Sequence, residues 1–322
     1  MSDSGETLRK PLEFEWPTLA LIGLCYVAWG LLTVHASALG GWLAVPLLGM
    51  VIAFHSSLQH EVLHGHPFRD QRLSDALVFP ALGLFVAYQR FRDTHLAHHH
   101  DEILTDPYDD PESNYLDPVV WARLPGWRKA LLRANNTLAG RMALGPAIGI
   151  AAFYAGDLRA IRAGDRAVRR AYVLHAAGLV PVVAWLVAVG TMPVWQYVLG
   201  AYLGLSLLKI RTFLEHRAHE KAAGRSVVIE DRGPLALLFL NNNFHAVHHA
   251  SPRVAWYRLP ALYRARRDEV LRRNRGYRYG SYGEVFARHF LRAKDPVPHP
   301  LRPGQGEGCE ATGVAGGALP RP

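Results

Sequence analysis

Long runs without a charged side chain limit most strongly how this chain can fold. Residues 17–36 and 39–55 contain no Asp, Glu, Lys or Arg, and the same holds for residues 171–190 and 193–208. Each run approaches the roughly 20 apolar residues that a helix needs to cross a bilayer. Because the links within each pair are short, we expect two helical hairpins. The sequence therefore predicts an all-α integral membrane protein with a bundle of about four transmembrane helices.

Two further apolar segments are shorter or interrupted. Residues 73–88 contain Pro80, and residues 138–156 contain Arg141 and Pro146. We expect both segments to form interfacial or re-entrant helices, which add to the bundle without crossing the membrane on their own.

Basic residues predict the orientation of the chain. Residues 157–171 hold five arginines against two aspartates, and residues 253–294 hold twelve Lys or Arg against three acids. Such an excess is typical of cytoplasmic loops, and it accounts for the net charge of +9 without a nucleic-acid partner. We assign residues 1–301 to one membrane domain and the Gly- and Pro-rich residues 302–322 to a disordered tail.

Twelve of the 17 histidines fall in four short clusters, each directly after an apolar segment. In the first cluster, HEVLHGH, His60 and His64 are four residues apart and so share one face of a helix. Related spacings recur in the other three: His95, His98 and His99 in HLAHHH, His216 and His219 in RTFLEHRAHE, and His245, His248 and His249 in HAVHH.

These spacings predict a metal site. Imidazole is a ligand for zinc, iron, copper and nickel rather than for calcium or magnesium, and two cysteines are too few for a Cys-based site. Eight or nine histidines of matched spacing are enough for two metals with open positions, whereas one zinc needs only three or four ligands. Two irons could activate dioxygen, and two zincs would suit hydrolysis. Packing, capping or surface roles are assigned to His35, His55, His175, His289 and His299.

A site for two metals also requires all four clusters on one side of the membrane. Four full spans satisfy this requirement and place the clusters in a cytoplasmic, histidine-rich cap, in agreement with the arginine bias. If residues 73–88 crossed the bilayer alone, the second cluster would lie on the opposite side from the first.

The order H-x-x-x-H, H-x-x-H-H and a late H-x-x-H-H resembles the integral-membrane fatty acid desaturase and hydroxylase superfamily, over residues 19–300. HEVLHGH, TDPYDDPES and EHR are most similar to its bacterial alkane hydroxylases and carotenoid ketolases, and a terminal-alkene-forming fatty acid decarboxylase is related. The resemblance implies a mushroom-shaped helical bundle in a bacterial inner membrane, two iron ions, dioxygen as oxidant and a separate electron donor. Carried over by position, the iron ligands would be His60, His64, His95, His98, His99, His216, His245, His248 and His249.

Acidic and amide side chains near the clusters are candidates to hold the ligand rings, because a ligating histidine usually donates its other N–H to an oxygen. The candidates are Glu61, Asp101, Asp106, Asp110, Glu215, Asn242 and Asn243, the two asparagines as holders of a metal-bound water. TDPYDDPES is equally typical of a Pro-Asp turn that caps the next helix. His66, His100 and His219 have no clear counterpart in the family; they are either additional groups that contact the ligand rings or surface residues, and we expect a surface position first.

We therefore expect a membrane oxidoreductase that uses dioxygen to activate a C–H bond of a fatty acid or other long-chain lipid, by desaturation or by hydroxylation as in a monooxygenase. Oxidative decarboxylation to a terminal alkene is the alternative outcome. A zinc-dependent membrane hydrolase and a metal transporter are the alternatives from other classes, although a transporter should carry its ligands midway along its spans. Because neither a cysteine pair nor a G-x-G-x-x-G fingerprint is present, we expect an external donor of the ferredoxin or rubredoxin type.

Small residues on the fourth predicted span have two interpretations. Gly200, Gly204 and Ser206 could leave room for a lipid-like substrate, or they could allow close packing of helices.

Overall fold

Long helices form the body of the protein. The structure, a computed structural model, describes residues 14–100 and 102–302, so that Asp101 and the expected disordered tail beyond Arg302 lie outside the described residues. Within the described ranges, four helices are long and apolar enough to cross a membrane. They are α1 (Trp16–Val34), α3 (Gly41–Leu63), α8 (Leu138–Arg162) and α9 (Arg166–Ala188). The prediction of an all-α membrane bundle is confirmed.

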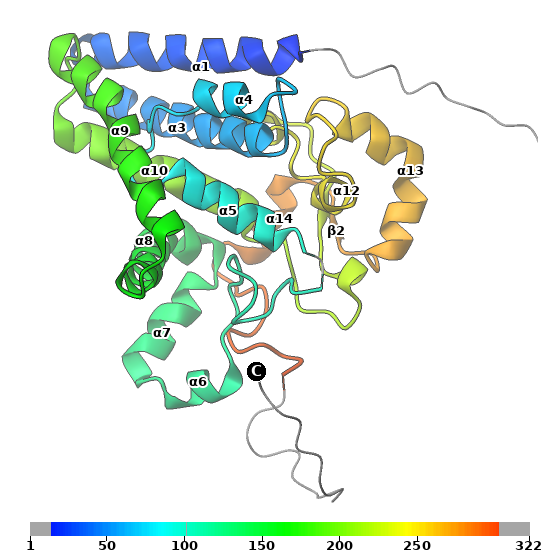
Figure 1. The fold of residues 1–322 in the computed structure, drawn as a ribbon. Coiled ribbons are helices and arrows are strands. Elements are labelled where there is room, and N and C mark those ends of the chain that lie inside the picture. The colour runs from blue at the N-terminus through cyan, green and yellow to red at the C-terminus, as the bar shows by residue number, and fades with distance from the viewer. Residues whose placement is uncertain (1–13, 101, 303–322) are drawn as a thin grey trace, which may run out of the picture.

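The helices α8 and α10 (Val194–Thr212) differ from expectation. Residues 138–156 belong to one continuous helix of 25 residues in spite of Pro146, and this helix is apolar enough to span. The expected fourth span, α10, is a 19-residue helix whose last turn carries Lys209 and Arg211, and it is not among the four apolar candidates. Figure 1 shows α1 and α3 lying along the page, whereas α8 is seen end-on. Therefore α8 runs across the α1–α3 hairpin rather than along it.

Glycines allow α3 and α10 to pack closely. A Cβ atom on Gly204 would lie 3.1 Å from the carbonyl oxygen of Gly49 and 2.8 Å from a methyl group of Ile52. A Cβ atom on Gly200 would lie 2.7 Å from a methyl group of Leu48. Of the two interpretations of these small residues, close helix packing is therefore the one that the structure supports.

The segment that follows α3 is not the helix expected at residues 73–88. A short helix, α4 (Gln71–Leu77), is followed by irregular chain as far as α5 (Tyr88–His98). Proline at position 80 has no N–H to donate and disfavours helix in the residue before it, and Leu84 takes a φ of 61°.

Side chains from the surrounding helices satisfy the carbonyl groups of this irregular segment. Non-helical backbone among membrane helices is tolerated only where protein satisfies its polar groups. The hydrogen bonds run from Tyr26 to the Leu77 oxygen at 2.8 Å, from Gln59 to Val78 at 3.2 Å, from Tyr197 to Leu82 at 2.9 Å, from His175 to Leu84 at 2.8 Å and from Tyr154 to Phe85 at 2.6 Å. His175, for which a packing, capping or surface role is expected, therefore caps the carbonyl group of Leu84.

The later short elements, among them α12 (His245–Ala250) and α13 (Leu259–Arg273), form a cap beyond the carboxyl end of α3 (Figure 1). Two strands, β1 (Val228–Ile229) and β2 (Arg278–Tyr279), pair in parallel there. The remaining elements are α2 (Ala36–Leu39), α6 (Pro118–Arg123), α7 (Gly126–Asn135), the 3-10 helix Ala222–Gly224, α11 (Pro234–Leu238) and α14 (Tyr282–His289).

We predict that Gly204→Ala lowers the thermal stability of the detergent-solubilised protein. Alanine is favoured over glycine in a helix by about 1 kcal/mol, but crowding in a packed interface costs about 1–3 kcal/mol. Gly23→Ala is the matched control, because nothing lies within 4 Å of a Cβ atom there. An unfolding temperature that is equal in the two variants would contradict the close packing of α3 and α10.

Candidate metal centre

Four segments bring the histidine clusters to one place. His60 lies in the last turn of α3, and His64 follows directly, where Gly65 with a φ of 101° ends the helix. The second cluster ends α5, and the fourth forms α12. His216 comes shortly after α10. The carboxyl ends of α3 and α5 both meet the cluster, and their exposed carbonyl groups favour positive charge there.

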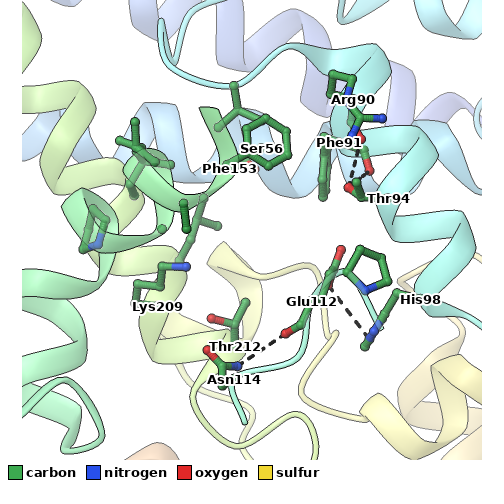
Figure 2. Close-up of a pocket in the computed structure, with 18 of the residues that line it drawn as sticks. Ser56, Arg90, Phe91, Thr94, His98, Glu112, Asn114, Phe153, Lys209 and Thr212 are labelled. Carbon is green, nitrogen blue, oxygen red and sulfur yellow. Dashed lines mark hydrogen bonds and ion pairs between the residues drawn. The ribbon is translucent and has the colours of Figure 1, made fainter. Parts of the chain in front are cut away.

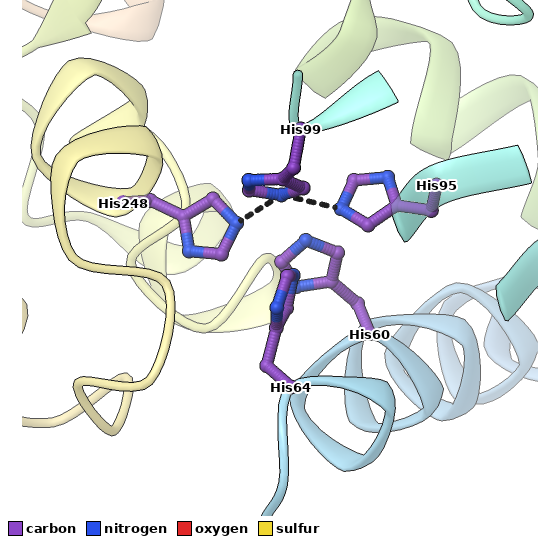
Figure 3. Close-up of side chains that lie close together, drawn as sticks. All are labelled: His60, His64, His95, His99 and His248. Atoms are coloured by element: carbon purple, nitrogen blue, oxygen red, sulfur yellow. Dashed lines mark hydrogen bonds between the residues drawn. The ribbon is translucent and has the colours of Figure 1, made fainter. Parts of the chain in front are cut away.

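All nine histidines assigned as ligands by resemblance lie in two groups whose nitrogens are within 4.8 Å of one another. The first group is His60, His64, His95, His99 and His248, and the second is His98, His216, His245 and His249. Figure 3 shows the first group, with His99 between His95 and His248 and with both α3 histidines on one side.

Helix geometry explains how each cluster divides between the groups. Residues four apart share a helix face, and every such pair enters one group together: His60 with His64, His95 with His99, and His245 with His249. The remaining member of each H-x-x-H-H box, His98 or His248, enters the other group.

The facing nitrogens fit a shared cation. The Nε2 atom of His99 lies 3.1 Å from that of His95 and 3.1 Å from that of His248. In the second group, the Nε2 atom of His216 lies 2.8 Å from that of His98 and 3.0 Å from that of His245. Nitrogens that bind one ion at about 2.0–2.1 Å lie about 3 Å apart when they occupy neighbouring positions around it.

Buried nitrogens without a partner point to the same conclusion. The Nε2 atoms of His60 and His64 are buried, and neither has a hydrogen-bond partner among the residues that the structure describes. A buried polar atom without a partner costs free energy. A metal ion held by these histidines would satisfy both atoms.

An outer set of oxygens fixes the orientation of the rings. Where Nδ1 donates its proton to an outer oxygen, the Nε2 lone pair is directed inward. Four Nδ1 atoms have such a partner: that of His95 at 3.0 Å from Glu112, that of His98 at 2.7 Å from Asp110, that of His216 at 3.1 Å from Ser226, and that of His245 at 3.2 Å from Asn242.

Among the expected ring-holding residues, Asp110, Asn242 and Glu215 lie beside ligand histidines. Glu215 is 3.7 Å from the Nδ1 atom of His245 and receives a 3.3 Å hydrogen bond from Asn242. Sequence reasoning missed Glu112, although it lies in the TDPYDDPES segment two residues after Asp110. It also missed Ser226, for which the sequence offers no signal because chain folding alone brings it to His216.

The other expected residues have different partners. A carboxylate oxygen of Glu61 accepts a hydrogen bond from the backbone of Trp256 at 3.2 Å. Asp106 accepts a hydrogen bond from the backbone N–H of Tyr108 in a turn and pairs with Arg302, whereas the next helix, α6 (Pro118–Arg123), is capped by Asp117 outside this segment. Asn243 donates to the backbone oxygens of Ile229 at 2.7 Å and Asp231 at 3.0 Å.

The three histidines without a clear family counterpart, His66, His100 and His219, differ in their exposure. His100 is exposed, as expected. His219 is only partly exposed, and its Nδ1 atom accepts a hydrogen bond from the backbone of Lys221 at 3.0 Å. The expectation of a surface position is wrong for His66, which is buried and whose Nδ1 atom pairs with Glu15 at 2.8 Å.

Electrostatics favour neutral rings at most of these positions. Burial, reinforced by the neighbouring imidazoles, holds the pKa values of His216, His245 and His248 well below 6.5. For His98, burial lowers the pKa, but the charge of Glu112 and the hydrogen bond to Asp110 outweigh it and raise the pKa to about 9. Neutral imidazole is the form that binds metals, and carboxylates beside His98 supply negative charge to balance a cation.

A cavity of about 560 Å³ opens onto the second group. His98, Glu112 and His216 line it, and its walls include apolar residues of the helices and, at Phe85, of the irregular chain between α4 and α5: Ile52, Phe85, Phe91, Ile150, Phe153, Leu205 and Leu208. Figure 2 shows Phe153 and Phe91 on one side of this cavity and Glu112, Asn114 and Thr212 on the other. The arrangement can hold a long apolar molecule with one part beside the histidines.

We predict that the purified protein binds two metal ions per chain, one for each group. His98→Ala and His216→Ala should lower the metal content toward one, because both remove ligands of the second group. His100→Ala, an exposed neighbour in sequence, should leave the content unchanged. Metal analysis by mass spectrometry measures this, and equal losses in all three variants would contradict the assignment.

We predict that Asp110→Asn weakens metal binding about 10- to 100-fold, the usual effect of losing a partner of a ligating histidine. In the wild type, the backbone N–H of Thr105 donates to the Asp110 carboxylate at 2.8 Å. The amide of the variant removes the negative charge beside His98 and can present an N–H group, in place of an acceptor, to the N–H of Thr105. Competition with a chelator measures the affinity. Asp109→Asn, at an exposed neighbouring site, is the control, and an equal affinity in both variants would argue against the role of Asp110.

A comparison with protein families agrees with this site. The family model described as "Fatty acid desaturase" matches residues 36–281, a range that contains all four histidine clusters. A search of curated proteins finds no match. Because the family model covers well over half of the chain, the protein belongs to the fatty acid desaturase family and is a membrane-bound, lipid-modifying oxidoreductase.

Proposed function

We propose that the protein is a diiron enzyme that uses dioxygen to oxidise a C–H bond of a long-chain fatty acid or related lipid. The observation that carries the proposal is the pair of histidine groups, five and four rings, with a largely apolar cavity that opens onto the second group. The assignment rests further on the family to which the chain belongs. We assign the activity to the membrane domain of residues 1–301, with the histidines on the cytoplasmic side.

The nine histidines would hold two iron ions, which when bound supply the redox chemistry that activates dioxygen. Glu112 and Asp110 keep the inner nitrogens of His95 and His98 directed at the metals and balance their charge. The apolar cavity walls orient the chain of the substrate and exclude water, which would otherwise compete for the oxidant.

Three outcomes are compatible with this site. Each consumes one O2 with two electrons and two protons from outside the substrate. Desaturation yields a double bond and two waters, hydroxylation yields an alcohol and one water, and oxidative decarboxylation yields a terminal alkene, CO2 and two waters. The family favours desaturation or hydroxylation, with decarboxylation as the alternative. The electrons would come from an external ferredoxin or rubredoxin with its reductase.

We predict that membranes containing the protein consume dodecanoic acid, longer fatty acids or alkanes when supplied with oxygen, iron and a reduced ferredoxin or rubredoxin. His98→Ala and His248→Ala should abolish turnover without preventing membrane insertion, since each removes a ligand from a different group. His100→Ala should retain it. Oxygen uptake and gas chromatography of lipids and headspace measure the reaction.

Two results would count against the proposal. One is the absence of any substrate loss with all three classes of chain while the protein is folded and loaded with iron. The other is full occupancy by zinc with hydrolytic activity that iron does not support, which would favour a zinc-dependent hydrolase on the same scaffold.

A further inference from the structure

The charged residues of the cavity are mostly paired. Arg90 binds Asp157 through two of its nitrogens, at 2.8 Å and 3.0 Å. Arg211 pairs with Glu215 at 3.2 Å. Lys294 donates to the backbone oxygen of His216 at 2.7 Å and lies 3.4 Å from Asp295. Each of these three cations therefore has a partner in the protein, although the Nη1 atom of Arg211 is buried without a hydrogen-bond partner among the described residues.

Lys209 is different. It lies in the last turn of α10 and lines the cavity, and it makes no hydrogen bond or ion pair with any residue that the structure describes. Its ammonium group points into the cavity in Figure 2. Gly149 on α8 lies opposite the ammonium group of Lys209, since a Cβ atom on Gly149 would lie 3.7 Å from the Lys209 Nζ atom. Because glycine has no side chain, the space next to the ammonium group stays open.

A second polar group on the same face of α10 also lines the cavity. Thr212 follows Lys209 by three residues, which places both on one face of α10, and both line the cavity. The Thr212 hydroxyl also has no hydrogen-bond partner among the described residues, and it faces the cavity in Figure 2. An ammonium and a hydroxyl on adjacent turns are suitable donors for the two oxygens of a carboxylate.

The nearby carboxylates of the protein are not ion-pair partners of Lys209. Glu112 binds the ring of His95 at 3.0 Å, and Glu215 pairs with Arg211. An unpaired ammonium in a largely apolar cavity is costly unless an opposite charge joins it.

We propose that Lys209, assisted by Thr212, binds the carboxylate of a free fatty acid inside the cavity. This inference rests on the proposed function and narrows its substrate class: the ionised acid is preferred over a hydrocarbon, an alcohol, an ester or a coenzyme A thioester of the same length. The neutral substrates lack the charge that Lys209 requires, and the acyl end of a thioester is also neutral.

The test is equilibrium binding of radiolabelled dodecanoate to the purified full chain in detergent at neutral pH, without turnover. The competitors are dodecan-1-ol, methyl dodecanoate and dodecanoyl-coenzyme A. We expect the wild type to bind dodecanoate at least about tenfold more tightly than dodecan-1-ol, and Lys209→Met to weaken dodecanoate binding about 10- to 100-fold, as for the loss of a charged hydrogen bond. Binding of dodecan-1-ol should not change.

Three further variants define the contribution of Lys209. Lys209→Arg keeps the charge and should retain most of the affinity, and Thr212→Val should weaken dodecanoate binding about 2- to 10-fold. Lys221→Met removes an exposed lysine outside the cavity and should have no effect. Thermal unfolding and metal content show whether each variant is folded.

The inference is overturned if the wild type binds dodecan-1-ol or dodecanoyl-coenzyme A as tightly as dodecanoate. It is also overturned if folded Lys209→Met binds dodecanoate as the wild type does. Should Lys209→Met not fold, the wild-type comparison of acid with alcohol decides the question alone. These measurements need no oxidation, so they test carboxylate binding separately from the proposed reaction. Selective binding of the acid without turnover would contradict the proposed reaction but not the role of Lys209.

Discussion

Nine imidazole rings that face one another, six of them buried and three half-buried, are the constraint on which the rest of the structure depends. The nitrogens lie as close as 2.8 Å, and burial keeps most of the rings neutral. Neutral rings in this arrangement direct lone pairs at each other, which is unfavourable unless a cation occupies the space between them. The fold must therefore bring distant segments together and also prevent the rings from turning away.

Two features of the scaffold meet this demand. Outer oxygens hold the rings, with Asp110 in turn fixed by the backbone of Thr105 and Glu112. The helices that carry the histidines are held by close contact: Gly49, Gly200 and Gly204 let α3 and α10 approach until backbone nearly touches backbone. Because packed helices resist small displacements, the positions of His60 on α3 and of His216 after α10 are coupled through this contact.

The cavity shows why such a centre belongs in a membrane protein of this family. Its walls come from α3, α8 and α10, so a long apolar molecule can lie among the helices while one part of it remains beside His98 and His216. The irregular chain between α4 and α5 also lines the cavity, at Ala81 and Phe85. Side chains of five helices donate hydrogen bonds to the carbonyl groups of this irregular chain. Polar backbone is thereby removed from a surface that must accept lipid.

Much of this protein can be predicted from local patterns in the sequence. Uncharged runs determine where the long helices lie, and the spacing of histidines four apart determines which pairs share a helix face, because both depend only on helical periodicity. The same reasoning failed for residues 73–88, where Pro80 and a left-handed Leu84 break the helix, and it did not anticipate the full length of α8.

Tertiary structure alone decided the rest. Three features follow from how segments distant in the chain meet: the group that His98 or His248 joins, the contact of Ser226 rather than a carboxylate with His216, and the lack of a hydrogen-bond or ion-pair partner for Lys209 among the described residues. Periodicity fixes the direction of a side chain relative to its own helix, but not what lies opposite it. That depends on the packing of α3, α5, α8, α10 and α12 against one another, which no local pattern contains.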